Sequence, residues 1–292
     1  MNQSSNQPEA GTNKQANLAQ GAAVAEPIKP HDDLSFEELA ELYNFQMTSD
    51  HQRIFTRLVI KECQKRTSPV RVLDVGCGRG IGRRPEFQWA IRAYVDEYWG
   101  LDPDESRFPP AGLFDKHQHA LMETAELPEN YFDVAYSYMV MEHVADPAGF
   151  LKALVKSLKP GGVYIFVTPN KRHYFTITAS LLHWLKLDEV VLRIIKRNTV
   201  DDYHYPVQYL FNDEKRINKV ANDLEFNKPE FVYIEQFGPR AYMPGPLKII
   251  YHLLQLKRKI IRKHKLLISL TCRMTKSPPA NSQTTSKSSA RQ

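Results

Sequence analysis

Three glycines at alternate positions directly after a short apolar segment make the stretch of this sequence best suited to bind a ligand. The apolar run 70–75 is followed by Gly76, Gly78 and Gly80. Glycine permits a positive φ and lets the backbone approach a bound molecule closely. A strand, a glycine turn and a helix N-terminus together form a nucleotide pocket at the carboxyl end of a parallel sheet. The order of these residues therefore predicts such a pocket.

Two carboxylates flank the glycines at spacings that discriminate between nucleotide ligands. Asp74 lies two residues before Gly76, where an acid suits cationic amino and sulfonium groups and is awkward beside a pyrophosphate. Asp102 ends the next predicted strand, where a carboxylate can accept hydrogen bonds from both ribose hydroxyls; a simple turn residue in the run 102–104 is the alternative. Ile81 replaces the third glycine of the dinucleotide fingerprint. These features favour S-adenosylmethionine over NAD or a nucleotide sugar.

Other candidate cofactor residues lie in and after the predicted strands. Glu123 follows a short predicted strand, so its carboxylate can accept from an adenine amino group and the N–H of Thr124 can reach a ring nitrogen; a solvated acidic turn is the alternative. Cys77 is a small residue inside the glycine loop, and three widely spaced cysteines without metal or triad spacing argue against a catalytic thiol. The predicted cofactor-binding set is Asp74, Gly76, Cys77, Gly78, Asp102, Glu123, Thr124 and Ser137.

Strands alternate with helices along most of the chain, which predicts a parallel sheet with right-handed crossovers. The predicted strands are 70–75, 98–101, 121–122, 131–137, 163–167, 231–235 and 266–271. The predicted helices lie near 35–45, 51–64, 87–94, 147–158, 179–196, 210–224 and 247–263. Asp146 is a suitable N-cap before Pro147. The last two strands lack a usual crossover, so a hairpin-like pair at one edge would make the sheet mixed.

Five segments in this order resemble class I S-adenosylmethionine-dependent methyltransferases of the type 11/25 kind. They are 74–80, 100–102, 126–128 with 132–134, 141–147 and 158–162. The resemblance covers about 71–170 and implies an α/β, Rossmann-like sheet of seven strands, mostly parallel, with an antiparallel last strand. Helices are then expected on both faces, with a C-terminal helical insertion. The family usually has Asp then Ala where this chain has Glu123 and Thr124.

Composition divides the chain into a central domain and two tails. We expect a disordered tail at 1–30, a methyltransferase domain at 31–276 and a disordered tail at 277–292. Within the domain, the core is about 70–170 and an acceptor or lid region is about 171–265. The N-terminus lacks the features of a secretory signal, and no window holds the roughly 18 apolar residues of a spanning helix. This predicts a cytoplasmic protein.

Basic residues are concentrated near the C-terminus. The chain has a formal charge of +6, yet residues 236–292 contain twelve Lys and Arg and no acid. The predicted helix 247–265 has an apolar stripe and a basic end, as in helices that bind the membrane interface, here at the inner surface. The alternative is a helix packed over the sheet edge, with its cations near its C-terminus. The local charge, and the absence of an Asn-Pro-Pro-Tyr motif, disfavour a nucleic-acid partner.

Methyl transfer to an acceptor oxygen requires positioning and, where the acceptor must lose a proton, a base. His143, just past the fourth predicted strand, is the candidate base, although it could instead only brace its loop. Glu142 could orient His143 or, with it, bind a divalent ion; no metal site is assigned. The adjacent residues Glu142 and His143 also resemble the Glu-His pair of the ubiquinone-pathway O-methyltransferases.

Aromatic residues with polar tips follow the fifth predicted strand and could line an acceptor site for a sugar or a phenol, or pack a lid. They are His173, Tyr174, Tyr203, His204, Tyr205 and Tyr209. The sequence thus predicts O-methylation of a small-molecule or glycan acceptor. Alternatives are a non-catalytic protein that binds S-adenosylmethionine or acts as a scaffold, and a membrane-surface O-methyltransferase of quinones or lipids.

Overall fold

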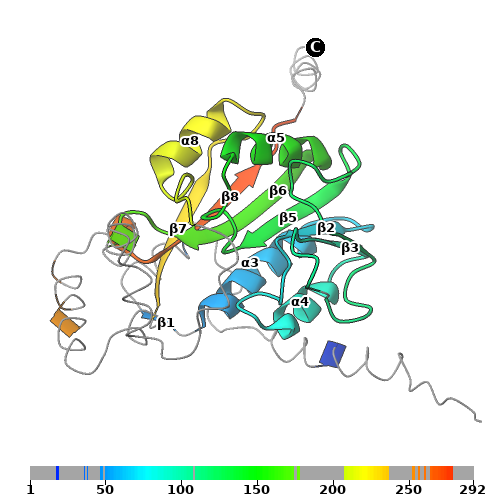
Figure 1. Cartoon of the computed structure of the whole chain (residues 1–292), viewed down its shortest axis with the longest axis horizontal. Helices are drawn as coiled ribbons and strands as arrows, with labels where there is room; N and C mark the ends of the chain where they lie inside the picture. The colour runs from blue at the N-terminus through cyan, green and yellow to red at the C-terminus, as the bar shows by residue number, and fades with distance from the viewer. Residues whose placement is uncertain are drawn as a thin grey trace, which may run out of the picture.

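One eight-stranded sheet organises the molecule (Figure 1). The computed structural model describes residues 50–107, 109–173, 207–236 and 264–278, with 18–19, 36, 38, 47–48, 176–177, 252–253, 256 and 260. The strands are β1 Met47–Thr48, β2 Arg71–Val75, β3 Glu97–Leu101, β4 Lys116–Gln118, β5 Phe132–Tyr138, β6 Leu158–Pro169, β7 Glu230–Gln236 and β8 Ser269–Thr275. The helices are α3 His51–Gln64, α4 Pro85–Arg92, α5 Pro147–Ser157, α8 Glu214–Asn222 and the 3₁₀ helix His264–Leu266.

The strand order is β1-β7-β8-β6-β5-β2-β3-β4. Among the described strands, β8 alone runs antiparallel, pairing with β6 on one side and β7 on the other. The predicted mostly parallel sheet with an antiparallel last strand is therefore confirmed. The two-residue β1, which the sequence did not predict, extends the edge beyond β7.

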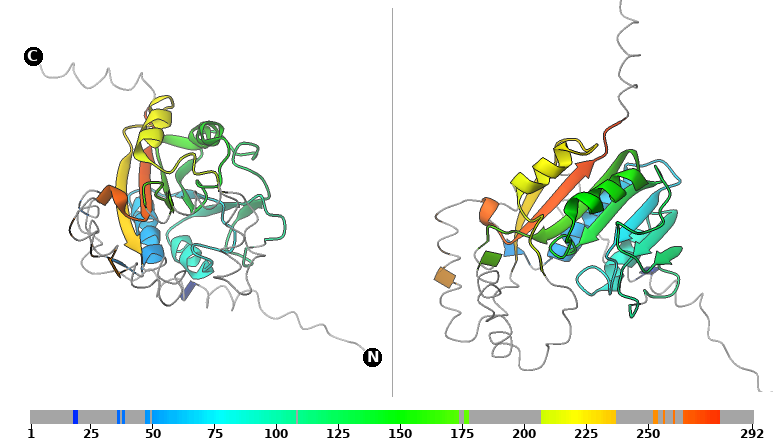
Figure 2. Two further views of the ribbon diagram at one scale, coloured as in Figure 1. Left: turned by 60° about the vertical axis from the view of Figure 1, so that its left-hand side comes forward. Right: turned by 45° about the horizontal axis from the view of Figure 1, so that its top comes forward.

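Helices cover both faces of the sheet, as Figure 1 and Figure 2 show. On one face, α3 and α4 pack Phe55, Val59 and Ile91 against inward residues of the strands. On the other, α5 and α8 pack Leu154 and Ile217 against the alternate strand residues. Because both faces are covered, the central strands are near-continuous apolar runs, and this is why the sequence located them correctly.

Helix α5 begins where the sequence predicts. The Asp146 carboxylate accepts a hydrogen bond from the Gly149 N–H at 3.0 Å, and Pro147 occupies the first turn. This cap satisfies one of the backbone N–H groups that a helix start leaves unpaired. The helix ends at Ser157, and the chain is extended from Leu158 onward. Strand β6 therefore starts five residues before the predicted strand 163–167 and includes Gly161 and Gly162.

Two predicted strands are misplaced. The third strand was expected at 121–122, but Leu121 and Met122 lie in a turn and the strand is β4. Strand β4 is a short edge strand that pairs with β3 through backbone hydrogen bonds, and its side chains are polar. The sequence therefore has no apolar run at this position that would predict a strand. The last strand was expected at 266–271 and lies at Ser269–Thr275. Arg273 interrupts the apolar pattern there, and its guanidinium pairs with Glu62 and Glu230.

Several sequence predictions lie wholly or mostly outside the described residues. These are the tails 1–30 and 277–292 and the helices near 35–45, 179–196 and 247–263. Within the last of these, Leu253, Leu256 and Ile260 are helical and exposed. Among the helices that the structure describes, none has the length and apolar character needed to cross a membrane.

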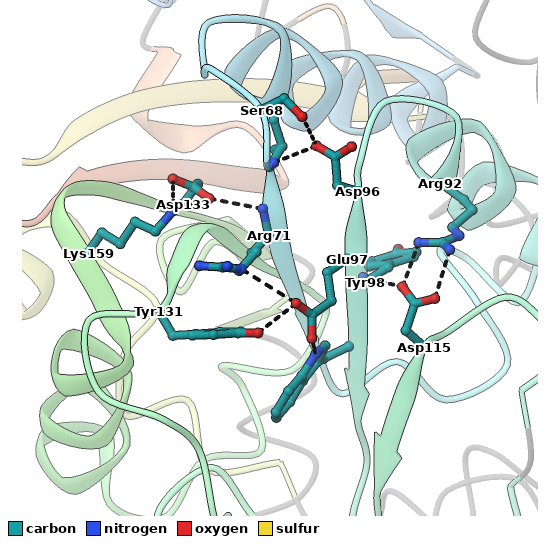
Figure 3. A network of polar contacts seen from close by, with 12 residues as sticks. Ser68, Arg71, Arg92, Asp96, Glu97, Tyr98, Asp115, Tyr131, Asp133 and Lys159 are labelled. Atoms are coloured by element: carbon teal, nitrogen blue, oxygen red, sulfur yellow. Dashed lines mark hydrogen bonds and ion pairs between the residues drawn. The ribbon is translucent and has the colours of Figure 1, made fainter.

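Carboxylates hold the amino ends of the central strands in a network shown in Figure 3. Asp96 accepts the N–H of Val70 at 2.7 Å, and Asp133 accepts the N–H of Arg71 at 2.9 Å. The second partner of Asp133 is the ammonium of Lys159, at 2.7 Å. These acids satisfy backbone groups at the edge of the sheet opposite the glycine loop.

We expect Asp133→Ala to lower the free energy of unfolding by about 2 kcal/mol, because it leaves a part-buried N–H and an ammonium without their acceptor. Urea unfolding followed by circular dichroism measures this change. Lys159→Met is the matched control: it keeps the acceptor for the Arg71 N–H, so it should cost less than Asp133→Ala. An equal cost for both variants would contradict this assignment.

Candidate functional site

The glycine loop has the left-handed backbone that its sequence predicts. The φ angles are 74° at Gly76, 39° at Gly78 and 98° at Gly80, values that side-chain-bearing residues rarely adopt. The N–H groups of Gly76 and Cys77 donate to the carbonyl of Leu101 at 2.6 and 3.1 Å. These bonds fix the loop against the carboxyl end of β3.

Close packing around two of the glycines leaves no room for a side chain. A Cβ on Gly76 would lie 2.3 Å from Cγ2 of Val140, and one on Gly80 would lie 2.7 Å from the backbone at Arg84 and Pro85. At Gly78 the nearest atom would be Oδ2 of Asp102, at 3.3 Å. The loop is therefore a tight backbone cradle with a carboxylate at its mouth, which fits the adenosine part of a nucleotide.

Asp102 lies directly after β3 and is 7% exposed. Its Oδ2 accepts from the N–H of Gly78 at 2.8 Å, and its Oδ1 accepts from the N–H of Asp104 at 2.9 Å. A carboxylate has about four lone-pair sites, so each oxygen can still accept a ribose hydroxyl. Asp102 thus links the glycine loop to the β3 end, beside the carbonyl of Gln118 that accepts its own N–H.

Asp74 lies in β2, two residues before Gly76, and is 2% exposed. Its Oδ2 accepts from the amide of Gln88 and from the hydroxyl of Tyr136, each at 2.6 Å. Gln88 also donates to the carbonyl of Cys77 at 3.1 Å, which ties α4 to the loop. Burial raises the pKa of Asp74 to about 7. The remaining oxygen, Oδ1, is the one that could face a cationic ligand.

The raised pKa of Asp74 predicts a pH dependence of stability. An unfolded Asp titrates near pH 4, so between about pH 4 and pH 7 the unfolded state loses this proton while the folded state keeps it. The free energy of unfolding then falls as pH rises through this window, by about 4 kcal/mol at most, at about 1.4 kcal/mol per pKa unit. Asp74→Asn keeps an acceptor for Gln88 and Tyr136 and should remove the part of the fall that Asp74 causes, whereas Glu142, whose pKa burial also raises to about 7, should still contribute its own part. Urea titrations at pH 4.5 and 7.5 measure the free energy of unfolding of both proteins. The same change between the two pH values in wild type and in Asp74→Asn would contradict the assignment.

Glu123 and Thr124 lie in an exposed turn after β4. The N–H of Thr124 donates to the carbonyl of Leu121 at 3.1 Å, so a contact from this N–H to an adenine ring would compete with that bond. The turn is held near the β3 end, because the side chain of Gln118 donates to the carbonyl of Glu126 at 3.0 Å. Glu123 and Thr124 thus lie at the carboxyl ends of the strands, as Asp102 does.

Two other predicted cofactor residues are buried. The thiol of Cys77 packs beneath Gly100, where an added Cβ would lie 3.1 Å from its sulfur, and burial raises its pKa above the ordinary range. It is therefore a protonated packing residue, and only its backbone can contribute to a cofactor. The hydroxyl of Ser137 bonds that of Tyr164 at 2.6 Å in the core. Since Ser137 follows Tyr136 in β5, it faces away from Asp74, and the structure does not bring it to the glycine loop.

Glu142 lies in the turn after β5 and joins three segments. Its Oε2 accepts from the hydroxyl of Thr168 at 3.1 Å, and the amide of Asn212 donates to the same hydroxyl oxygen at 2.5 Å. Its backbone carbonyl accepts the N–H groups of Gln208 and Tyr209 at 2.7 and 3.1 Å. Burial raises the pKa of Glu142 to about 7. These contacts suit a residue that positions the segment 207–212 beside the pocket.

His143 is half-buried in the same turn, and its N–H donates to the carbonyl of Val140 at 2.9 Å. Since Val140 packs on Gly76, His143 lies near the glycine loop. His173 is buried, with Nε2 at 3.8 Å from a carboxylate oxygen of Glu235. The other aromatic candidates Tyr174, Tyr203, His204 and Tyr205 lie outside the described residues. Within the described part of the chain, no three His, Cys, Asp or Glu gather as a metal site would require.

Sequence reasoning missed the residues that hold the site together. Gln88, Tyr136 and Asn212 make the buried bonds to Asp74 and Thr168. A signal existed for Gln88, because it is a polar residue within the apolar run 87–91 that the helix buries. No comparable signal marks Asn212, whose role depends on contacts between segments far apart in the sequence.

Comparison with known proteins agrees with this geometry. A family model described as "Methyltransferase domain" matches residues 43–209, more than half of the chain. The ubiquinone biosynthesis O-methyltransferase of Ruegeria pomeroyi is 34% identical over 139 residues, which are 45% of this chain and 52% of that protein. The protein of the same name from Bradyrhizobium diazoefficiens is 31% identical over 188 residues, 62% of this chain and 69% of that protein.

The chain spans about half the length of the first of these relatives. Among solved structures, a loganic acid methyltransferase with S-adenosylhomocysteine is similar over 87% of this chain and 100% of its own, with a TM-score of 0.51 and 14% identity. This similarity supports the fold alone. With the family match and the glycine-loop geometry together, the chain belongs to the methyltransferase-domain family of class I S-adenosylmethionine-dependent enzymes.

Proposed function

We propose that this protein transfers the methyl group of S-adenosylmethionine to a hydroxyl oxygen of a small-molecule acceptor. One observation carries the proposal: the carboxylate of Asp102 lies at the mouth of the glycine loop and accepts the Gly78 N–H at 2.8 Å. This combination suits a ribose with two free hydroxyls. The relatives named ubiquinone biosynthesis O-methyltransferase support an oxygen acceptor.

We assign the cofactor contacts as follows. The backbone of Gly76, Cys77 and Gly78 cradles the adenosine part, and Asp102 accepts the ribose hydroxyls. Asp74 lies on the side of the loop where a cationic group would be stabilised. The exposed turn at 123–124 is assigned to the adenine. When bound, S-adenosylmethionine supplies an electrophilic methyl carbon and a good leaving group, so alignment of the acceptor oxygen accounts for much of the acceleration.

The turn after β5 is assigned to the acceptor. Glu142 holds the segment 207–212 through Thr168 and its own carbonyl, and His143 lies beside it. A small acceptor with a phenolic or sugar hydroxyl is the substrate class that we propose, with a quinone precursor or a glycan as the two members to test first.

Labelled methyl transfer tests this function. The full chain, the tritiated methyl donor and a panel of catechols, other phenols and sugars should yield labelled product from at least one hydroxyl compound. A labelled product that NMR identifies as a methyl ether indicates O-methylation. The same assay is repeated with a cell extract as the source of acceptors. Binding of the donor without methyl transfer to any compound of the panel or the extract would favour the alternative of a non-catalytic binding protein.

We further propose a cytoplasmic location with peripheral contact to the inner membrane surface. The support is the basic C-terminal segment, with twelve Lys and Arg and no acid over residues 236–292, and the exposed Leu253, Leu256 and Ile260. Sedimentation with vesicles containing phosphatidylglycerol should exceed that with pure phosphatidylcholine and fall as salt is raised. Equal binding to both would contradict the contact.

A further inference from the structure

A buried histidine outside the predicted site lies next to the glycine loop. His51 is the first residue of α3 and is 1% exposed. Its Nδ1 lies 3.1 Å from the hydroxyl of Tyr138, the last residue of β5. Its other ring nitrogen, Nε2, is buried and has no hydrogen-bond partner among the residues that the structure describes. Buried polar atoms are nearly always paired, so this nitrogen needs an explanation.

The two residues of this pair come from segments that pack on the glycine loop or on the residues just after it. Gln52, the residue after His51, would lie 2.7 Å from a Cβ on Gly82. Val140, two residues after Tyr138, packs on Gly76. The carboxyl ends of parallel strands are where ligands bind in such sheets. His51 and Tyr138 therefore lie near the carboxyl ends of the strands, where the methyl donor and the methyl acceptor must meet.

The surroundings of His51 favour an aromatic ligand. The rings of His51 and Tyr138 have centroids 5.8 Å apart, and Phe55 packs edge-on against Tyr138 at 5.4 Å. Aromatic rings prefer such tilted and edge-to-face neighbours. A phenolic acceptor would add one more ring and bring its hydroxyl to the unpaired nitrogen.

We propose that Nε2 of His51 binds the acceptor hydroxyl and takes its proton during methyl transfer. In this step the acceptor oxygen forms a bond to the methyl carbon, and the carbon–sulfur bond breaks with its electron pair remaining on sulfur. The hydroxyl proton passes to Nε2, giving an imidazolium. This step requires that the Tyr138 oxygen accepts the Nδ1–H, because that tautomer leaves a lone pair on Nε2.

Burial also keeps His51 neutral before the reaction. It lowers the pKa of the ring to about 4, so at neutral pH one nitrogen carries a lone pair. Burial, and to a smaller extent the nearby Glu142, raise the pKa of Tyr138, so its hydroxyl stays protonated beside the ring of His51. The inference rests on the proposed O-methyltransferase function and adds the group that handles the proton.

The test is a ¹⁵N NMR titration of the histidine rings in the full chain saturated with S-adenosylhomocysteine, with catechol as the probe. The expected result is a shift of the His51 Nε2 signal, identified by its loss in His51→Gln. The turnover rate with catechol should be about 100-fold or more lower in His51→Gln than in wild type. The Kd of this variant for S-adenosylmethionine should stay within threefold of wild type. Tyr138→Phe should bind the donor normally and show an altered His51 tautomer ratio.

A His51 signal unmoved by saturating catechol would overturn the proposal, as would turnover of His51→Gln within threefold of wild type. If His51→Gln does not fold, the wild-type titration decides alone, with the signal assigned through its change in Tyr138→Phe. Failure of wild type to bind S-adenosylmethionine would instead refute the underlying methyltransferase function, so the two failures are distinguishable.

Discussion

Asp102→Ala is expected to weaken S-adenosylmethionine binding by at least about 100-fold. The substitution removes the proposed acceptor of both ribose hydroxyls and leaves the N–H groups of Gly78 and Asp104 without their partner. Hydrogen bonds to a charged group contribute about 1.5–3 kcal/mol each, and 1.4 kcal/mol is a tenfold change in affinity. Isothermal titration calorimetry measures the effect.

Glu105→Ala is the matched control for this variant. It removes the same charge from an exposed position in the same turn and should bind the cofactor as wild type does. Asp102→Asn should fall between the two, because an amide keeps one acceptor oxygen but loses the charge. Normal affinity in Asp102→Ala would show that the carboxylate only shapes the turn, which is the alternative that the sequence leaves open.

Gly76→Ala is expected to eliminate cofactor binding and to lower the melting temperature by several degrees. The new Cβ would lie 2.3 Å from Val140, and the backbone φ of 74° is strained for any residue with a side chain. Relief requires the glycine loop or the turn after β5 to move, and both form the pocket. Calorimetry and thermal unfolding measure the two effects.

The chain offers a close control for the strain at Gly76. Gly161 has a φ of 76°, and an added Cβ there would meet no atom within 4 Å. Gly161→Ala therefore carries the backbone strain, about 1–2 kcal/mol, without the collision and far from the pocket. Binding should be normal in Gly161→Ala. Equal binding by the two variants would contradict the proposal that close packing on Val140 shapes the site.

Those parts of the fold that depend on local patterns were predictable from the sequence. Apolar runs located the central strands because both faces of the sheet are buried, and Asp146 with Pro147 located the start of α5. The position of Asp102 directly after β3 was predictable because an apolar run marks the end of that strand. In contrast, β4 and the end of β8 were misplaced, since an edge strand and a strand that contains Arg273 lack the apolar signal.

The contacts that complete the site were not predictable in the same way. Asp74 was assigned from its position beside the glycines, but its partners Gln88 and Tyr136 are 14 and 62 residues away. Glu142 was a candidate catalytic residue, and only the folded chain shows its carboxylate bonded to Thr168. His51 drew no notice in the sequence because a lone histidine at a helix start has no motif. Each case depends on long-range packing.

Calorimetric titration of the full chain with S-adenosylmethionine tests the central claim most directly. We predict one site per chain with a micromolar Kd, no detectable heat with NAD under the same conditions, and loss of the binding heat in Asp102→Ala. Absence of S-adenosylmethionine binding by the intact protein, or equal binding of NAD, would contradict the account.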